Sequence, residues 1–172
     1  MTTAPRPRLG ISSCLLGERV RFDGGHKRDV FLTDVFGPHV EWVPVCPEVE
    51  AGFGTPREPM QLVRADGRLR LVTLTTGRDL TERMERFART RVEALERDEL
   101  CGYVFKSQSP SCGIEARGLF AARVIERCPG LPVEEDGRLS DPALRRTFIA
   151  RVFAYARLRG MACPTPDRLD PG

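Results

Sequence analysis

The chain has 172 residues, 41% of them apolar and 30% charged, with a formal net charge of +3, as expected for one globular domain with a sizeable core. No apolar run approaches the roughly 20 residues that cross a bilayer, and Met1–Arg8 lacks the apolar core of a signal peptide. The sequence therefore predicts a cytoplasmic protein with no membrane partner. The small charge, without a basic stripe, also argues against a nucleic-acid partner.

In the first half of the chain, short apolar runs alternate with stretches rich in Gly and Pro. Gly37-Pro38 stops a helix, and Asp66-Gly67 is a strong signal for a two-residue hairpin turn. Earlier in the chain, the glycines of Asp23-Gly24-Gly25 allow backbone amides to approach a ligand. The predicted elements are, in order, a disordered leader (1–7), a strand (8–12), a helix (29–36), a strand (40–45), a loop (48–59) and the two strands of a hairpin (60–63 and 69–74).

The second half of the chain predicts three helices and one strand. Asp79 and Glu82 have the spacing of a capping box, and Pro142 suits the first position of a helix. The predicted elements are a helix (79–98), a strand (102–105), a helix (119–126), a loop that runs to residue 138, and a last helix (142–156) that frays from residue 157. The side chains expected on the buried faces of the first and last helices are Leu80, Met84, Phe87, Val92, Leu95, Leu144, Phe148, Val152 and Tyr155.

Strands that alternate with helices predict an α/β fold. We expect a single Rossmann-like domain over residues 8–160, with a largely parallel sheet flanked by helices, and a tail over residues 161–172. In such sheets, ligands bind beyond the carboxyl ends of the strands.

Three of the six cysteines each follow a predicted strand, in loops rich in Ser, Pro and Gly: Cys14, Cys46 and Cys112. Because these strand ends share one edge of the sheet, we expect the three thiols to meet there. The other three are predicted to be buried small hydrophobes or incidental thiols: Cys101, Cys128 and Cys163. In the cytoplasm thiols stay reduced, so metal binding or catalysis is favoured over disulfides.

Three thiolates without a fourth ligand leave one metal position open, and catalysis requires an open position. A four-iron cluster or a zinc ion with a bound water would both fit. The residues alone leave further interpretations open. One is a sensory or structural metal module without catalysis, closed by Cys101 as a fourth ligand. Another is a sulfur carrier that uses one cysteine as a persulfide.

Several polar residues lie beside the three cysteines. Glu48 follows Cys46 by two residues, so it can face the same cavity and transfer a proton. Ser109 can bind a ligand or shape a turn, and Arg57 can hold an anion. Only two of the 27 basic residues are lysines, Lys27 and Lys106, and both lie beside cysteine loops. This bias suggests a site that needs an ammonium group.

Three motifs resemble the thiouracil desulfurase (desulfidase) family: ISSCLLGxxVRFDGGHK, VCPEVxAGFxTPR and FKxxSPSCG. The resemblance runs from about residue 8 to residue 159. It implies a 4Fe-4S cluster bound by three cysteines, which map onto Cys14, Cys46 and Cys112. It also implies removal of sulfur from thiolated uracil compounds such as 2-thiouracil, 4-thiouridine or its nucleotide, giving the uracil product and sulfide.

Within this resemblance, Glu48 is the candidate for proton transfer and Ser109 for orienting the substrate. The candidates for contacts to the pyrimidine or to a phosphate are Asp23, Lys27, Arg57 and Lys106. The sequences around Cys46 and near residues 131–142 resemble the branch of this family in which a second, helical domain follows. Only residues 114–117 separate the SPSCG motif from the next predicted helix, a shorter loop than the family usually has. The choice among base, nucleoside and nucleotide and the oligomeric state stay open.

Overall fold

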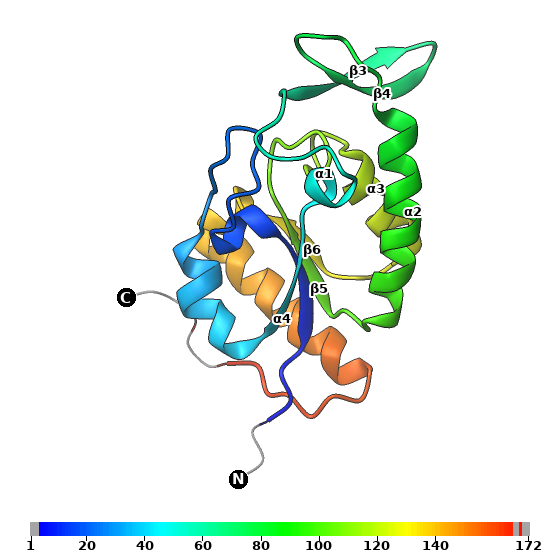
Figure 1. Cartoon of the computed structure of the whole chain (residues 1–172). Coiled ribbons are helices and arrows are strands. Elements are labelled where there is room, and N and C mark those ends of the chain that lie inside the picture. Colours follow the sequence, from blue (N-terminus) through cyan, green and yellow to red (C-terminus); the bar gives the residue numbers. More distant parts are fainter. Residues whose placement is uncertain (1–3, 167–168, 170–172) are drawn as a thin grey trace.

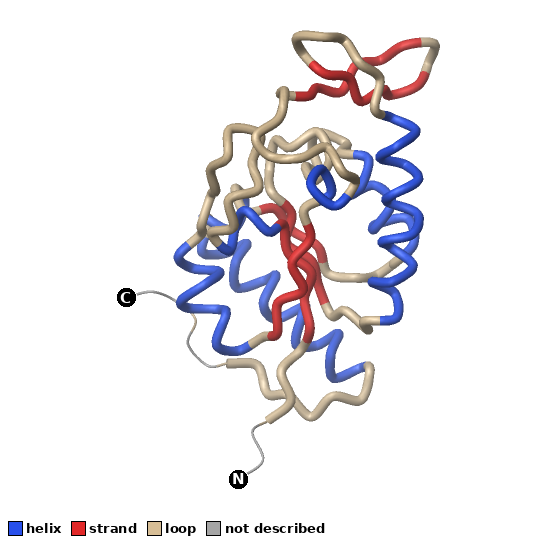
Figure 2. The backbone as a smooth tube through the Cα atoms, viewed as in Figure 1, coloured by secondary structure: helices blue, strands red, loops and turns tan. Residues whose placement is uncertain are grey.

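The computed structural model describes residues 4–166 and 169. Its centre is a sheet of four parallel strands in the order β2 (Glu41–Val45), β1 (Arg8–Ser12), β5 (Gly102–Phe105) and β6 (Val133–Glu135). Helices lie on both sides of these strands (Figures 1 and 2). The predicted α/β fold with a parallel, Rossmann-like sheet is therefore confirmed.

Successive residues of the central strands face opposite sides of the sheet, as the two-residue period of a strand requires. Leu9, Ile11 and Val104 pack into one hydrophobic cluster with α4 (Pro142–Leu158) and the helical segment Phe31–Phe36. Tyr103 and Phe105 pack into a second cluster with α2 (Thr81–Arg97) and α3 (Leu119–Arg127). Burial on both faces explains why residues 9–11 of β1 and all four residues of β5 carry no charged side chain.

Gly10 on β1 lies directly opposite Tyr103 on β5. A Cβ atom at this position would collide with the Tyr103 ring. The glycine therefore lets the large ring lie flat across the neighbouring strand, where it also stacks on Phe105 with ring centroids 4.1 Å apart.

The hairpin of β3 (Met60–Ala65) and β4 (Arg68–Thr73) projects from the domain at the top of Figure 1. Ala65 pairs with Arg68, so Asp66-Gly67 forms the whole turn. Both residues have positive φ, 50° and 73°, as a type I′ turn requires. The prediction from Asp66-Gly67 is confirmed.

The last helix begins as predicted. Asp141 caps it, because its carboxylate accepts hydrogen bonds from the backbone N–H groups of Ala143 (2.8 Å) and Leu144 (3.4 Å). The buried face was only partly predicted, since Phe148 and Val152 are buried but Leu144 and Tyr155, like Phe87 on α2, are half-buried. The side chains that complete the buried face are Ile149, Phe153 and Ala156.

Several predicted elements need correction. The capping box at Asp79 is wrong: α2 begins at Thr81, and Asp79 accepts from the Thr81 N–H at 2.9 Å from outside the helix. The predicted loop 48–59 begins with a helical turn, α1 (Pro47–Glu50). The predicted helix 29–36 is a π-helix over Phe31–Phe36 and continues as a 3₁₀ turn over Gly37–His39 instead of stopping at Gly37-Pro38.

The segment before residue 138, predicted to be a loop, contains the strand β6. β6 has only three residues, followed by a 3₁₀ turn at Arg138–Ser140. Its Tyr103–Val133 pairing adds it to the sheet beside β5. This strand was missed because three residues are too short to show an alternating pattern.

The ends of the chain are described in part. Pro7 is buried, and its carbonyl accepts from the Glu41 N–H at 2.9 Å; residues 1–3 of the predicted leader lie outside the described residues. Cys163 and Leu169 of the predicted tail are buried against the α4 side of the core, so the tail does not fray throughout. None of the described helices is both long and apolar enough to cross a membrane.

Candidate active site

The three predicted cysteines meet at one edge of the sheet. Cys14 follows β1, Cys46 follows β2, and Cys112 lies in the loop after β5, so they come from three adjacent parallel strands. The chain passes from β1 to β2 on one side and to β5 on the other, so the strand order reverses at β1, where open α/β sheets bind ligands. All three cysteines line one cavity of about 710 Å³.

The other residues that line this cavity come mainly from the four loops that follow β1, β2, β5 and β6: Ser12, Ser13, Val20, Arg21, Phe22, Lys27, Arg28, Asp29, Val45, Pro47, Glu48, Arg57, Pro59, Met60, Lys106, Ser107, Gln108, Ser109, Pro110 and Asp136. Of the nine predicted site residues, the structure brings eight together here. A cavity of this volume is in the range of small-molecule sites.

Cys14 lies in the 3₁₀ turn Ser13–Leu16 that ends β1. Its carbonyl accepts hydrogen bonds from the N–H groups of Gly17 (3.2 Å) and Lys27 (2.9 Å). The loop between these two residues is thereby closed on the cysteine. This explains how a polar, glycine-rich loop holds Lys27 at the cavity.

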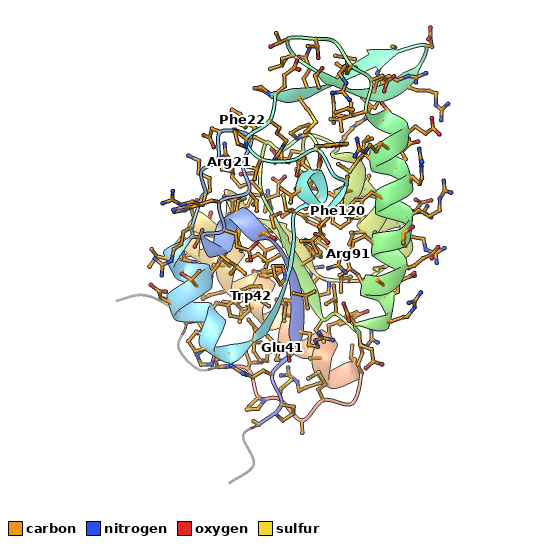
Figure 3. All side chains as sticks on the ribbon, in the orientation of Figure 1. Arg21, Phe22, Glu41, Trp42, Arg91 and Phe120 are labelled. Carbon is orange, nitrogen blue, oxygen red and sulfur yellow. The ribbon has the colours of Figure 1, made fainter. Side chains whose placement is uncertain are left out.

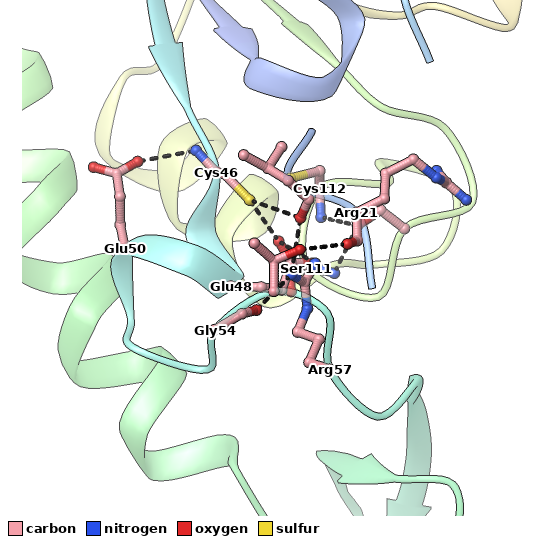
Figure 4. A network of polar contacts seen from close by, with 11 residues as sticks. Arg21, Cys46, Glu48, Glu50, Gly54, Arg57, Ser111 and Cys112 are labelled. Carbon is pink, nitrogen blue, oxygen red and sulfur yellow. Dashed lines mark hydrogen bonds and ion pairs between the residues drawn. The ribbon is translucent and has the colours of Figure 1, made fainter. Parts of the chain in front are cut away.

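Cys46 is the N-cap residue of α1. Its N–H donates to the Glu50 carboxylate at 2.9 Å, and Glu50 is held in turn by Arg91 at 3.0 Å. The Cys46 thiol donates to Glu48 at 3.6 Å and to the Val20 carbonyl at 3.8 Å (Figure 4). The sequence did not indicate Glu50, because the helical turn α1 that brings it back to Cys46 was not predicted.

Cys112 is held by contacts on both sides. Its N–H donates to the Ser109 hydroxyl oxygen at 3.1 Å. The carbonyl of Ser111 accepts from the Phe120 and Ala121 N–H groups, both at 3.1 Å, which joins the loop to the start of α3. A Cβ atom on Gly118 would collide with the Ser111 backbone, so glycine is needed for this close approach.

Burial keeps the three thiols protonated when no metal is bound. Burial raises the pKa of Cys14 to about 11, although the positive charges of Lys106 and Arg21 lower it. Burial, and then the negative charge of Glu48, raises the pKa of Cys46 to about 12. The same two causes raise the pKa of Cys112, while a hydrogen bond from Ser12 lowers it. Loading a metal centre onto these thiols therefore releases protons.

Glu48 is 7% exposed and lines the cavity. One of its carboxylate oxygens accepts from the Cys46 thiol, and the same oxygen lies 4.0 Å from Nη2 of Arg57. The carboxylate is thus next to one thiol and one guanidinium at the cavity wall. This geometry places it where a proton could be given or taken.

Arg57 has a side chain that is only 9% exposed. Its Nη1 donates to the carbonyls of Val20 (2.8 Å) and Gly54 (3.0 Å). Its Nε is buried without a hydrogen-bond partner among the described residues. Buried donors are rarely left unpaired, so the Nε–H of this cavity-lining residue is a candidate donor to a ligand.

Both lysines of the chain line the cavity. Lys106 is held by Asp136 at 3.2 Å, in a pair whose side chains are 17% and 16% exposed. Asp136 also accepts from the N–H (2.7 Å) and the hydroxyl (2.9 Å) of Ser107. Lys27, by contrast, is exposed at the cavity wall. Asp136 was not predicted because β6, which precedes it, was not recognised.

Asp23 is the one predicted site residue that does not line the cavity. Its carboxylate accepts from the Gly25 N–H at 2.9 Å, and the Gly24 N–H donates to the Arg21 carbonyl at 2.9 Å. The amides of Gly24 and Gly25 are therefore used within a tight turn. The sequence had instead suggested that they face a ligand. The Asp-Gly-Gly pattern is here the pattern of a turn.

Ser109 lines the cavity but also shapes the loop. Its oxygen accepts from the N–H groups of Ser111 (3.3 Å) and Cys112 (3.1 Å). The hydroxyl hydrogen is not used in these two bonds, since the oxygen is the acceptor in both. The turn-shaping role of Ser109 is therefore confirmed, and its role in ligand binding stays a prediction.

The idea that Cys101 supplies a fourth ligand is wrong. Cys101 directly precedes β5, whereas Cys112 lies beyond its other end. A four-residue strand separates the two ends by about 13 Å. Cys101 instead packs into the core with Met161 and Cys163.

The three thiols that line the cavity, Cys14, Cys46 and Cys112, suit an iron–sulfur cluster by type and position. Thiolates are the usual ligands of such clusters, and three of them line the same cavity, from which Cys101 is excluded. Among the described residues, no three His, Cys, Asp or Glu side chains are grouped tightly enough to surround one metal ion. Ligands of a four-iron cluster each bind a different iron, so they share the cavity without sharing an ion.

The chain is similar to known proteins over most of its length. A family model described as 2-thiouracil desulfurase matches residues 9–136, which include all three cavity cysteines. The uncharacterized protein YbbK of Bacillus subtilis (strain 168) is 34% identical over 110 residues, covering 60% of this chain and 71% of that protein. The solved structure of the (4Fe-4S)-dependent thiouracil desulfidase TudS matches with a TM-score of 0.67 and 27% identity, covering 84% of this chain and all of that one.

Proposed function

The chain belongs to the 2-thiouracil desulfurase family, and we propose that it is a (4Fe-4S)-dependent enzyme that removes sulfur from thiolated uracil compounds. The observation that carries this proposal is the arrangement of Cys14, Cys46 and Cys112 around one cavity at the carboxyl ends of three adjacent strands. The similarity to TudS, whose fold covers most of this chain, supports the cluster. Cytoplasmic location stays a prediction.

The proposed reaction exchanges sulfur for oxygen without net oxidation or reduction. A thiocarbonyl and one water give a carbonyl and hydrogen sulfide, so the C–S bond breaks as the C–O bond forms. A bound cluster with three protein ligands supplies one open iron position that can hold the sulfur. The protein must then position the pyrimidine and move a proton from the water.

Glu48 is the residue that we assign to this proton transfer. Its burial and its place beside Cys46 support the role. Once Cys46 has lost its proton to act as a ligand, its sulfur no longer donates to Glu48. The carboxylate oxygen is then free to accept a proton from water and to return it to the product.

Ser109 is assigned to orienting the substrate. Its oxygen accepts from the backbone next to Cys112, which fixes the hydroxyl close to one cluster ligand. The hydroxyl hydrogen can then be donated to an oxygen or nitrogen of the pyrimidine. Arg57 is assigned to the same task because its buried Nε–H donates to no acceptor among the described residues.

The cations of the cavity support an anionic substrate, such as the nucleotide of 4-thiouridine. Lys106 is paired with Asp136, and Arg28 with Asp34. Lys27 and Arg21 remain at the cavity wall without a carboxylate partner among the described residues. A phosphate near them would be favoured, because ammonium and guanidinium groups both bind phosphate. A lower KM for the nucleotide than for the free base would support this assignment.

The test is an anaerobic assay of the cluster-loaded protein. Loss of the thiocarbonyl absorbance of 2-thiouracil or 4-thiouridine is followed for the wild type, Cys112→Ala and Glu48→Gln. We expect turnover in the wild type and none in Cys112→Ala, and Glu48→Gln should keep its iron but lose about 10²- to 10⁴-fold in kcat. A loaded wild-type protein without turnover of any thiolated uracil would contradict the proposal. Full activity of Glu48→Gln would remove the carboxylate from the mechanism.

A further inference from the structure

Phe22 is an aromatic side chain in an unusual place. It is the only aromatic residue among those that line the cavity. It is also 39% exposed, whereas the other Phe, Tyr and Trp side chains within the described part of the chain are buried or half-buried. Turn positions usually carry Gly, Pro, Asn, Asp or Ser, so a phenylalanine next to Asp23 in this turn has no local reason to be there.

The backbone that carries this ring is held firmly. Three successive carbonyls accept hydrogen bonds from the segment that leads to β3: Val20 from Nη1 of Arg57 (2.8 Å), Arg21 from the Thr55 hydroxyl (2.9 Å) and Phe22 from the Arg57 N–H (2.8 Å). Figure 3 shows Arg21 and Phe22 together on this loop, beside that segment. The ring is therefore solvent-exposed on a fixed backbone.

The turn itself is closed by further hydrogen bonds. The Arg21 N–H donates to the Gly25 carbonyl at 3.2 Å, and the Asp23 carboxylate accepts from the Gly25 N–H at 2.9 Å. Asp23 thus holds the turn in which Phe22 lies. The guanidinium of Arg21 lies 5.6 Å from the centre of the Phe22 ring, so one face of the ring already has a cationic neighbour.

We propose that Phe22 stacks on the pyrimidine ring of the substrate and determines affinity for planar bases. This inference rests on the proposed function, which supplies the planar ligand. An exposed aromatic ring on a rigid turn is the means by which proteins bind bases, because every base offers an apolar face. Arg21, beside the ring, would meet the more polar part of the ligand.

The experiment compares Phe22→Leu, which keeps apolar bulk but removes the ring, with Phe22→Tyr, which keeps the ring. A matched control is Ile125→Ala, since Ile125 is 40% exposed on α3 and lies away from the cavity. Each cluster-loaded protein is titrated with uridine monophosphate by calorimetry, and KM and kcat are measured with its 4-thio analogue. Thermal unfolding checks that all variants are folded.

For Phe22→Leu we expect about tenfold weaker binding and a KM about tenfold higher, with kcat within about twofold of the wild type. Phe22→Tyr and Ile125→Ala should bind within about twofold of the wild type. Unchanged binding by Phe22→Leu, equal losses in Phe22→Leu and Phe22→Tyr, or a wild type that does not bind the nucleotide would overturn the stacking proposal. Binding is measured without turnover, so an inactive wild type that shows the expected pattern would refute the desulfidase function and leave the stacking intact.

Discussion

Glu135, on β6, is expected to hold the short loop that follows Cys112. Its carboxylate is 3% exposed and accepts from the N–H groups of Ile114 (2.5 Å) and Glu115 (3.2 Å). The loop after the SPSCG motif is only a few residues long, and these two bonds hold it to β6, while the Gly118 N–H donates to the Gly113 carbonyl (2.8 Å) within the loop. Replacing Glu135 by Ala should therefore loosen the segment that carries Cys112, one of the three proposed cluster ligands.

The size of the effect follows from the surroundings of the two donors. Hydrogen bonds to charged groups contribute about 1.5–3 kcal/mol each, but Glu115 is exposed, so water can replace the acceptor there. A loss of about 2–3 kcal/mol in the free energy of unfolding is expected. For a chain of this length that corresponds to a decrease of about 4–12 °C in Tm.

Thermal and urea unfolding of the cluster-free protein measure this loss, and iron content after reconstitution shows whether Cys112 still holds its place. Glu82→Ala is the control, because Glu82 is an exposed partner of Arg86 on α2 and such pairs contribute less than about 1 kcal/mol. Equal Tm values for Glu135→Ala and Glu82→Ala would refute the argument that the buried carboxylate holds the loop.

Two further results are expected. Burial raises the pKa of Cys14 to about 11 and that of Cys46 to about 12, so between pH 9 and 11 the unfolded chain loses thiol protons that the folded chain retains. The free energy of unfolding of the cluster-free protein, measured in urea, should therefore fall as the pH rises through this range. In Cys46→Ala this fall should be less steep. Asp136→Ala should lower the free energy of unfolding by about 1.5–3 kcal/mol, because it leaves the Lys106 ammonium and the Ser107 N–H without their carboxylate. In the double variant Asp136→Ala/Lys106→Met, the share of this loss that comes from the unpaired ammonium should be removed. An unchanged pH profile in Cys46→Ala, or additive losses in the double variant, would contradict these expectations.

The sequence predicted the centre of the fold because the relevant signals are local. Apolar runs ended by Ser, Pro or Gly marked β1, β2 and β5, and a parallel sheet then required Cys14, Cys46 and Cys112 to lie at one edge. The scarcity of lysine was also informative, since both lysines line the cavity.

What the sequence could not predict depends on contacts across the chain. Asp136 and Glu135 join the loop before Cys112 and the loop after it to β6, a strand too short to recognise. Glu50 reaches Cys46 only through the helical turn of α1. Asp23 was predicted to contact the substrate, but its carboxylate accepts a hydrogen bond from the Gly25 N–H. Local hydrogen bonds of this kind compete with a bond to a ligand.

The most direct test of the account is the iron content of six single variants, in which each cysteine in turn is replaced by Ala. After anaerobic reconstitution, the wild type should hold about four irons per chain, as a 4Fe-4S cluster requires. Cys14→Ala, Cys46→Ala and Cys112→Ala should lose the cluster and its absorbance, whereas Cys101→Ala, Cys128→Ala and Cys163→Ala should keep both. Loss of iron from Cys101→Ala, or full retention in any of the first three, would contradict the assignment of the site.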